Sequence, residues 1–169
     1  MDRKKKLKIV QLCLISIGIL ALVFTYSDKI NLKKKSSSTQ ELKKEIDLSI
    51  YKFPENLNDA IKKEPPHILC LSNYAWNLNL SYLFAKYIKK VDPNIVVISG
   101  GPNFPIDKEE RQSFLKCHNA IDFYIKWDGE LAFIELAKKL IEGNLNVSRF
   151  KESKMVLDNV CYVIGDDYV

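Results

Sequence analysis

A short apolar run that ends in a glycine turn constrains the fold more than any other feature of this sequence. Residues Asn94–Asn103 have the sequence Asn-Ile-Val-Val-Ile-Ser-Gly-Gly-Pro-Asn. An unbroken run of β-branched residues is typical of a strand that is buried on both faces, as in a parallel sheet. Glycines directly after such a strand allow another group to approach the backbone closely. We therefore expect a parallel sheet with a binding crevice above the carboxyl ends of its strands.

Strand-like and helix-like segments alternate along the chain. Apolar runs predict strands near residues 8–13, 47–53, 67–72, 94–100 and 121–127. Helical spacing of apolar residues, with capping and stop signals, predicts helices near residues 19–30, 56–63, 79–91, 107–117 and 129–142. Because parallel strands need crossover helices, this order predicts an α/β fold, a flavodoxin-like (Rossmann-like) three-layer sandwich with a mainly parallel five-stranded sheet. In the flavodoxin-like strand order the ligand crevice lies between the first and third strands.

The length of 169 residues suits one main globular unit. We divide it into a basic N-terminal tail (1–7), an α/β domain (8–145) and a connector (146–169). The connector ends in a predicted hairpin formed by Asn159–Val163 and Gly165–Val169. We expect it to lead toward a further domain that this sequence lacks.

The positive charge of the chain is local. Lys and Arg number 26 against 21 Asp and Glu, and much of the excess lies in Arg3–Lys8 and Lys33–Lys35. Charge clusters in tails and loops are usually solvated. The composition therefore argues against a nucleic-acid-binding face.

The four cysteines, Cys13, Cys70, Cys117 and Cys161, are far apart and form no CxxC or Cys-His spacing. Zinc and iron–sulfur sites need clustered soft ligands, so we predict neither. Two of the cysteines lie in apolar, strand-like runs, where reduced cysteine acts as a small core residue. This pattern predicts a cytoplasmic protein.

One apolar segment leaves two interpretations open. Ile9–Tyr26 is an 18-residue run without a charge, which is long enough for a membrane anchor. Under that alternative the chain is a membrane-anchored small α/β protein of signalling or scaffold type. Ser16 and Gly18 interrupt the run, however, and lysines flank both of its ends. These features favour the other interpretation, in which the run is the first strand and first helix of the domain.

The loops that follow the predicted strands are rich in small, amide and aromatic residues. They comprise residues 13–18, 72–77, 100–103 and 127–130. No Ser-His-Asp or paired-carboxylate arrangement can be assembled from them, so we predict no catalytic residue. Such loops suit a flat ligand with amide edges better than a substrate for hydrolysis.

Three segments together carry a resemblance to a known family. They are Ile68–Asn77, Pro93–Pro102, and Ile121–Glu130 with the apolar helix that follows it. In this order and spacing they resemble the cobalamin-binding domain at the amino end of cobalamin-dependent radical S-adenosylmethionine enzymes, over roughly Lys8–Gly143. The resemblance implies cobalamin as cofactor and the following cofactor-binding residues: Ser72, Asn73, Tyr74, Trp76, Asn77, Gly100, Gly101, Pro102, Gly129 and Glu130.

Two motifs of related proteins are missing from the sequence. The Asp-x-His-x-x-Gly motif, which supplies a histidine to cobalt in other cobalamin domains, is absent, so no protein metal ligand is expected. The CxxxCxxC motif of the radical domain is also absent. We therefore expect no iron–sulfur cluster, no catalysis by this chain alone, and a radical domain as a partner in cis or in trans.

Each predicted contact also has a purely structural interpretation. The Gly100–Gly101 pair can be an ordinary turn, and Tyr74 and Trp76 can be rim packing instead of a wall for the corrin. Glu130 can interact with the dipole of the helix in whose first turn we place it. These alternatives stay open on the sequence alone.

Overall fold

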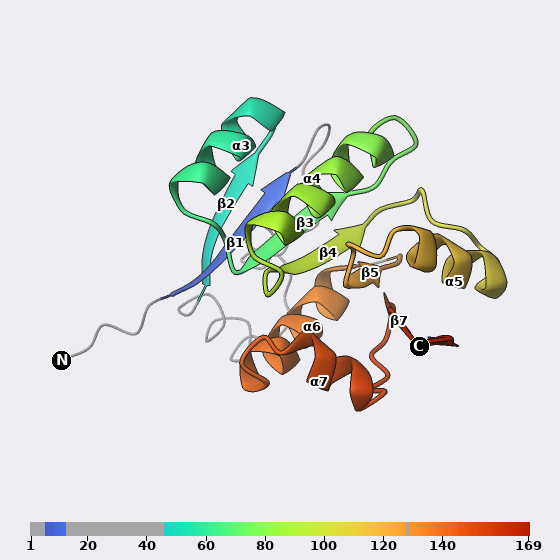
Figure 1. The fold of residues 1–169 in the computed structure, drawn as a ribbon. Coiled ribbons are helices and arrows are strands. Elements are labelled where there is room, and N and C mark those ends of the chain that lie inside the picture. The colour runs from blue at the N-terminus through green and yellow to red at the C-terminus, as the bar shows by residue number, and fades with distance from the viewer. Residues whose placement is uncertain (1–5, 13–45, 128) are drawn as a thin grey trace, which may run out of the picture.

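A six-stranded sheet forms the centre of the molecule. The computed structural model describes residues 6–12, 46–127 and 129–169. The strand order is β2-β1-β3-β4-β5-β6, and the first five strands are parallel. The strands are β1 (Leu7–Leu12), β2 (Ile46–Tyr51), β3 (Ile68–Ser72), β4 (Val96–Gly100), β5 (Phe123–Ile125) and β6 (Val160–Cys161). Figure 1 shows the sheet with helices on both sides.

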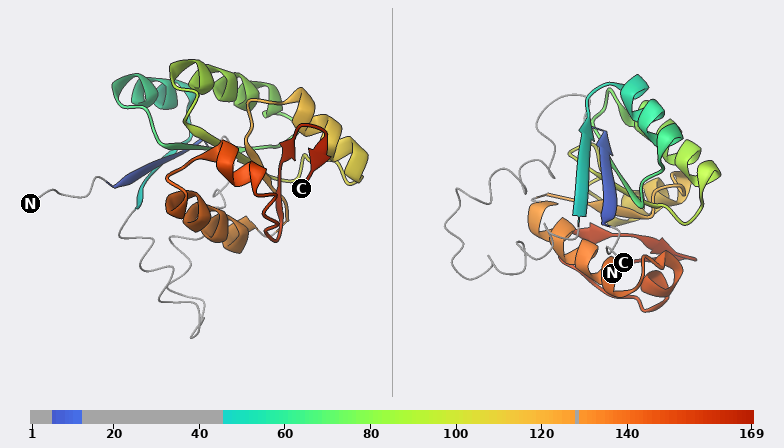
Figure 2. Two further views of the ribbon diagram at one scale, coloured as in Figure 1. Left: turned by 60° about the horizontal axis from the view of Figure 1, so that its bottom comes forward. Right: turned by 90° about the vertical axis from the view of Figure 1, so that its left-hand side faces the viewer.

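Helices cover the two faces of this sheet and complete three layers (Figure 2). The helices are α3 (Pro54–Lys63), α4 (Leu78–Val91), α5 (Lys108–Cys117), α6 (Gly129–Glu142) and α7 (Val147–Glu152). One core includes residues of β1, β3 and β4 together with residues of α3 and α4, and the core on the opposite face includes residues of α6 and α7. The predicted three-layer, flavodoxin-like α/β class is therefore confirmed.

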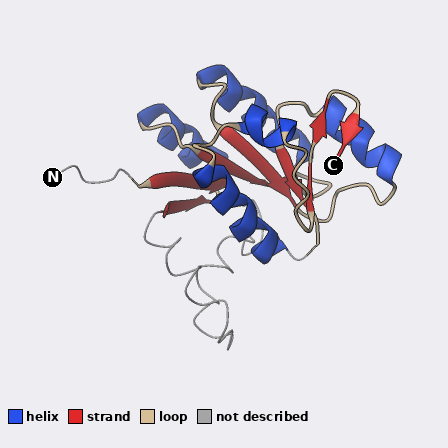
Figure 3. Ribbon diagram, turned by 90° about the horizontal axis from the view of Figure 1, so that it is seen from below, coloured by secondary structure: helices blue, strands red, loops and turns tan. Residues whose placement is uncertain are grey.

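The strand order places β1 between β2 and β3. Ile9 is in register with Leu48 of β2 and with Ile68 of β3. This neighbourhood of the first and third strands is the arrangement that the sequence predicts for a ligand crevice. Figure 3 shows the strands running side by side between the helical layers.

The sheet has one strand more than the predicted five. β6 pairs antiparallel with β5, in register through Tyr124 and Cys161. A separate two-stranded hairpin follows, formed by β7 (Val163–Ile164) and β8 (Asp167–Tyr168). A C-terminal hairpin is thus present, but its first strand is β7, and Val160–Cys161 of the predicted first arm extend the main sheet instead.

Local sequence signals account for the helix ends. The Asp107 side chain accepts hydrogen bonds from the backbone amides of Glu109 and Glu110, so it caps α5 as its sequence suggests. α3 begins earlier than the predicted residue 56, because Pro54 occupies its first turn after Phe53. Proline is favoured there, since the first-turn amides have no partner within the helix.

Part of the ambiguous segment Ile9–Tyr26 is visible. Ile9–Leu12 belong to β1 and are buried between two neighbouring strands. Residues 13–26 lie outside the described part of the chain. Among the helices that are described, none is long and apolar enough to cross a membrane.

The segment predicted as a connector also contributes to the core. Phe150 of α7 packs edge-to-face on Phe123 of β5, with ring centroids 5.1 Å apart. Tyr162 contacts the same phenylalanine at 5.6 Å, and its hydroxyl donates to the carbonyl of Met155. Residues 146–162 therefore contribute to the core on the α6 face of the sheet. That the segment leads to another domain stays a prediction.

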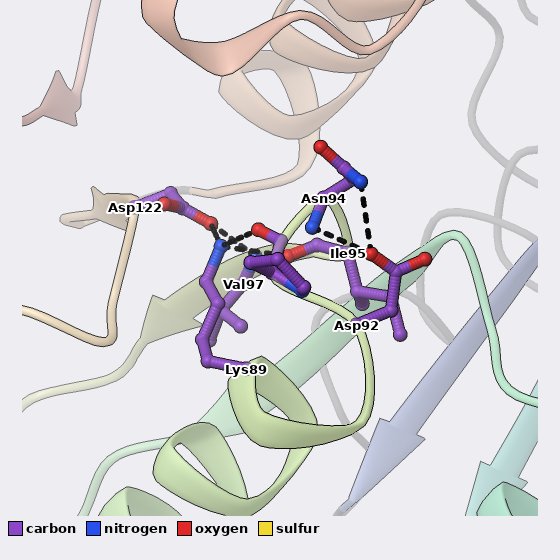
Figure 4. A network of polar contacts seen from close by, with 7 residues as sticks. Lys89, Asp92, Asn94, Ile95, Val97 and Asp122 are labelled. Carbon is purple, nitrogen blue, oxygen red and sulfur yellow. Dashed lines mark hydrogen bonds and ion pairs between the residues drawn. The ribbon is translucent and has the colours of Figure 1, made fainter.

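A polar network joins three elements at the opposite edge of the sheet from the predicted site (Figure 4). Lys89 near the end of α4 forms an ion pair with Asp122 at 2.6 Å and donates to the carbonyl of Ile95. The same carboxylate oxygen of Asp122 accepts from the amide of Val97 at 2.7 Å. The network holds the end of α4 against the amino ends of β4 and β5.

Candidate functional site

The candidate site lies at the carboxyl edge of the parallel strands. Three of the four predicted loops lie at this edge among the described residues: 72–77 after β3, 100–103 after β4, and 127 with 129–130 after β5. The fourth predicted loop, residues 13–18 after β1, lies outside the described residues. The loops after β3 and β4 are joined by hydrogen bonds, which define the local shape of this edge.

Asn73 is the centre of that connection and is only 1% exposed. Its amide donates to the carbonyl of Gly100 at 2.7 Å, and its side-chain Nδ2 donates to the carbonyl of Asn103 at 2.6 Å. In return, Nδ2 of Asn103 donates to Oδ1 of Asn73 at 3.1 Å. The carboxamide of Asn73 therefore fixes the loop after β4 relative to the loop after β3.

Tyr124 of β5 is hydrogen-bonded to both loops of this junction. Its hydroxyl accepts from Nδ2 of Asn73 at 3.0 Å and donates to the carbonyl of Gly101 at 2.8 Å. Its ring stacks on Phe104, with centroids 3.8 Å apart. Burial raises the pKa of Tyr124 above its ordinary value, although the hydrogen bond from Asn73 opposes that shift. The hydroxyl therefore stays protonated and donates at neutral pH.

Gly101 is required by the packing of the two loops. Its φ is +134°, and a Cβ at this position would lie 2.4 Å from the carbonyl oxygen of Asn73. The sequence predicts that a valine here blocks a ligand while leaving the fold largely intact. The geometry corrects this expectation, since any side chain at Gly101 would strike the backbone of Asn73 first.

Asn77 shapes the turn before α4. Its Oδ1 accepts from the amide of Tyr74 at 2.7 Å, and its Nδ2 donates to the hydroxyl of Ser72 at 3.1 Å. Ser81 in the first turn of α4 donates to the carbonyl of Ser72 at 3.0 Å. Asn77 and Ser81 are buried, so their polar groups hold the backbone of the loop.

Two aromatic residues of this loop face outward. The rings of Tyr74 and Trp76 are stacked, with centroids 4.8 Å apart and planes 13° from parallel. Trp76 is 64% exposed. The pair forms a flat aromatic surface at the rim, which is the packing that one of the two sequence interpretations expects, and it leaves the indole accessible.

The remaining predicted residues are spread along the same edge. Pro102 is exposed in the loop after β4, and Gly100 is buried at the end of that strand. Gly129 is buried at the start of α6, and Glu130 is half-buried in its first turn. The structure thus joins the loops after β3 and β4 directly, while Gly129 and Glu130 lie beyond β5.

Sequence reasoning did not single out Gln11, although it is a polar residue inside an apolar strand. Gln11 is the last residue but one of β1, in register with Ile50 of β2 and Cys70 of β3. It is 4% exposed, and its Oε1 has no hydrogen-bond partner among the described residues. A buried acceptor without a partner is costly, so its position beside the β1–β3 neighbourhood is notable.

Neither histidine of the chain lies in this site. Nδ1 of His67, before β3, accepts from the amide of Lys8 at 2.9 Å, and Nδ1 of His118 lies 2.8 Å from the carbonyl of Phe114. Within residues 6–12, 46–127 and 129–169, no three His, Cys, Asp or Glu side chains gather as a metal site would require. Cys70 and Cys161 are buried with free thiols, and Cys117 is exposed.

Two proteins of known function share local similarity with this chain. One is the cobalamin-dependent radical SAM methyltransferase TokK of Streptomyces tokunonensis, 37% identical over 71 residues, which are 42% of this chain and 10% of that protein. The other is a 2-(S-pantetheinyl)-carbapenam-3-carboxylate methyltransferase of Streptantibioticus cattleyicolor, 34% identical over 71 residues with the same coverage. This chain therefore spans about a tenth of the length of these relatives. No protein-family model matches the sequence.

Proposed function

We propose that this chain binds cobalamin at the carboxyl edge of its sheet. The observation that carries the proposal is the local similarity to a cobalamin-dependent radical SAM methyltransferase. The fold agrees with it, because β2-β1-β3-β4-β5 is the flavodoxin-like strand order, in which a ligand crevice is expected between β1 and β3.

The residues at this edge fit the chemistry of a corrin. Its broad, largely apolar face suits the stacked rings of the half-buried Tyr74 and the exposed Trp76. Its peripheral amide groups supply N–H donors, and the buried Oε1 of Gln11 is an acceptor without a partner among the described residues. Both features support a ligand that is flat in its centre and rich in amides at its edge.

The predicted binding residues divide into two groups on this proposal. Tyr74, Trp76, Pro102 and Glu130 are exposed or half-buried and would contact the cofactor. The buried members Asn73, Asn77, Gly100 and Gly129, with Ser72 and Gly101, would hold the loops in place. Bound cobalamin would supply organometallic chemistry at cobalt, while the protein would supply binding and orientation.

The proposal extends to the larger protein. Because this chain lacks CxxxCxxC and spans a tenth of its relatives, we propose a radical S-adenosylmethionine domain as its partner, in cis or in trans. Methyl transfer would then belong to the combined protein. The cytoplasmic location predicted from the cysteines is part of the same proposal.

Retention of a corrin by the purified chain tests the proposal. After incubation with hydroxocobalamin and desalting, we expect a retained corrin with a base-off spectrum. No histidine should replace the base on cobalt, because both histidines are engaged elsewhere. Trp76→Ala should lower retention, whereas Leu83→Ala should not, since Leu83 is an exposed apolar residue in the middle of α4. Absence of corrin from the desalted wild-type chain, at protein concentrations well above micromolar, would refute the proposal.

A further inference from the structure

Four of the nine exposed large apolar side chains in the described part of the chain follow strands at the carboxyl edge of the sheet. Phe53 follows β2, Trp76 follows β3, Ile106 follows β4 and Trp127 follows β5, with exposed fractions of 56%, 64%, 84% and 70%. Exposed apolar side chains also lie elsewhere in the described part of the chain, Leu83 and Val156 among them, so exposure alone does not mark a binding surface. The two tryptophans in this set are the only ones in the sequence.

Trp127 differs from the other three in its backbone conformation. Its φ is +56°, in the left-handed region that L residues with large side chains rarely adopt. The amide of its neighbour Lys126 donates to the carbonyl of Asn159 at 2.9 Å, which ties this part of the chain to the segment before β6. Glycine or asparagine would adopt the same conformation at lower cost.

The other described residues with positive φ have local explanations that Trp127 lacks. Asn144 and Leu145 end α6, where the amide of Leu145 donates to the carbonyl of Leu140 at 2.7 Å, and the Leu145 side chain packs against the core. Lys154 and Asn159 are polar residues in turns. The Trp127 side chain is 70% exposed. Burial of the indole within this chain therefore does not offset the free-energy cost of the backbone conformation.

We infer that the indole of Trp127 is a ligand contact, positioned to cover cobalamin from the β5 side of the site. This inference rests on the proposed function and adds a residue that neither the sequence motifs nor the similarity singles out. Trp76 follows β3 and Trp127 follows β5, with β4 between them, so the two loops start about 10 Å apart. A macrocycle spans that separation and can contact both indoles, whereas a phosphate or a single ring cannot.

The inference predicts opposite effects of one substitution on stability and on binding. Trp127→Gly relieves the backbone conformation, so we expect a higher midpoint of thermal unfolding, while the affinity for hydroxocobalamin falls about tenfold or more. Trp127→Phe keeps a planar ring and should keep most of the affinity. Asn159→Gly is the matched control, because Asn159 also has positive φ (+61°), in the turn before β6 to which Lys126 is hydrogen-bonded, and its replacement should leave binding unchanged.

Equilibrium dialysis with hydroxocobalamin, measured by corrin absorbance, separates the outcomes. If wild type and Trp127→Gly bind equally well, the inference is wrong while the proposed function stands. A glycine variant that is less stable than wild type would also overturn it, since the backbone argument would then fail. If wild type retains no hydroxocobalamin, the proposed function fails and this inference fails with it.

Discussion

At the scale of single residues, one buried amide determines how two loops meet. Asn73 uses its backbone and its side chain to bond Gly100 and Asn103, and its carbonyl lies against Gly101. The donors and acceptors of this carboxamide are therefore used within the protein. The outer surface of the site is left to residues whose side chains point away from this junction, above all Trp76.

This geometry predicts that Gly101 is needed for folding. Gly101→Ala should lower the free energy of unfolding by about 3 kcal/mol, because the new Cβ meets the carbonyl oxygen of Asn73 and because φ is positive. Gly165→Ala is the matched control: φ is +55° there, but nothing lies within 4 Å of a Cβ. It should cost about 1 kcal/mol. Urea unfolding measures both, and equal losses would show that contact with Asn73 does not matter.

The sequence indicates the special role of Gly101 but not its cause. A Gly-Gly-Pro turn after an apolar strand predicts a close approach, and the approaching group proves to be the protein's own backbone at Asn73. Trp127 is the opposite case, because the sequence does not indicate its unusual backbone conformation. Its residue type gives no sign of a positive φ, since the preference for that conformation belongs to glycine and asparagine.

At the scale of elements, the length of a helix or strand determines whether the sequence predicts it. The five parallel strands and the long helices α4 and α6 each contain enough apolar residues for a periodic pattern. β6 has two residues and α7 has six, which is too short for such a pattern. The sequence therefore predicts Val160 and Cys161 as part of a hairpin arm and not as a sixth strand beside β5, although both residues are buried.

The polar network at the amino edge gives a prediction about how these elements are held together. Asp122→Ala should lower the free energy of unfolding by about 3 kcal/mol, because it leaves Lys89 without its carboxylate and the amide of Val97 without its acceptor. The Asp122 side chain is only 10% exposed, so water replaces these bonds poorly. Chemical denaturation monitored by circular dichroism measures the loss.

A surface ion pair provides the control for this prediction. Nζ of Lys139 and Oε2 of Glu142 lie 2.7 Å apart near the end of α6, and the two side chains are 39% and 63% exposed. Glu142→Ala should change the free energy of unfolding by less than about 1 kcal/mol, since exposed pairs are screened and cost entropy to order. A loss at Asp122 as small as the one at Glu142 would mean that the network is not a structural link.

At the scale of the whole molecule, the question is whether residues 146–169 are part of the folded unit or a connector beyond it. The sequence predicts a connector there, because the strand and helix alternation stops near Gly143. In the structure Phe150, Leu157 and Tyr162 are buried in the core on the α6 face of the sheet. The hairpin beyond them packs Val163 and Tyr168 against the core of the other face.

Truncation of this segment distinguishes a connector from an integral part of the fold. A chain that ends at Leu145 loses β6, and it exposes Phe123, which contacts the rings of Phe150 and Tyr162. Removing one large core side chain costs about 3–5 kcal/mol, and a whole domain is stable by only about 5–15 kcal/mol. We therefore expect the truncated chain to show no cooperative thermal transition by circular dichroism. A chain that ends at Tyr162 keeps these rings and should unfold cooperatively at a lower temperature than the full chain. A cooperative transition of the shorter chain at the full-length midpoint would instead establish residues 146–169 as a separable connector.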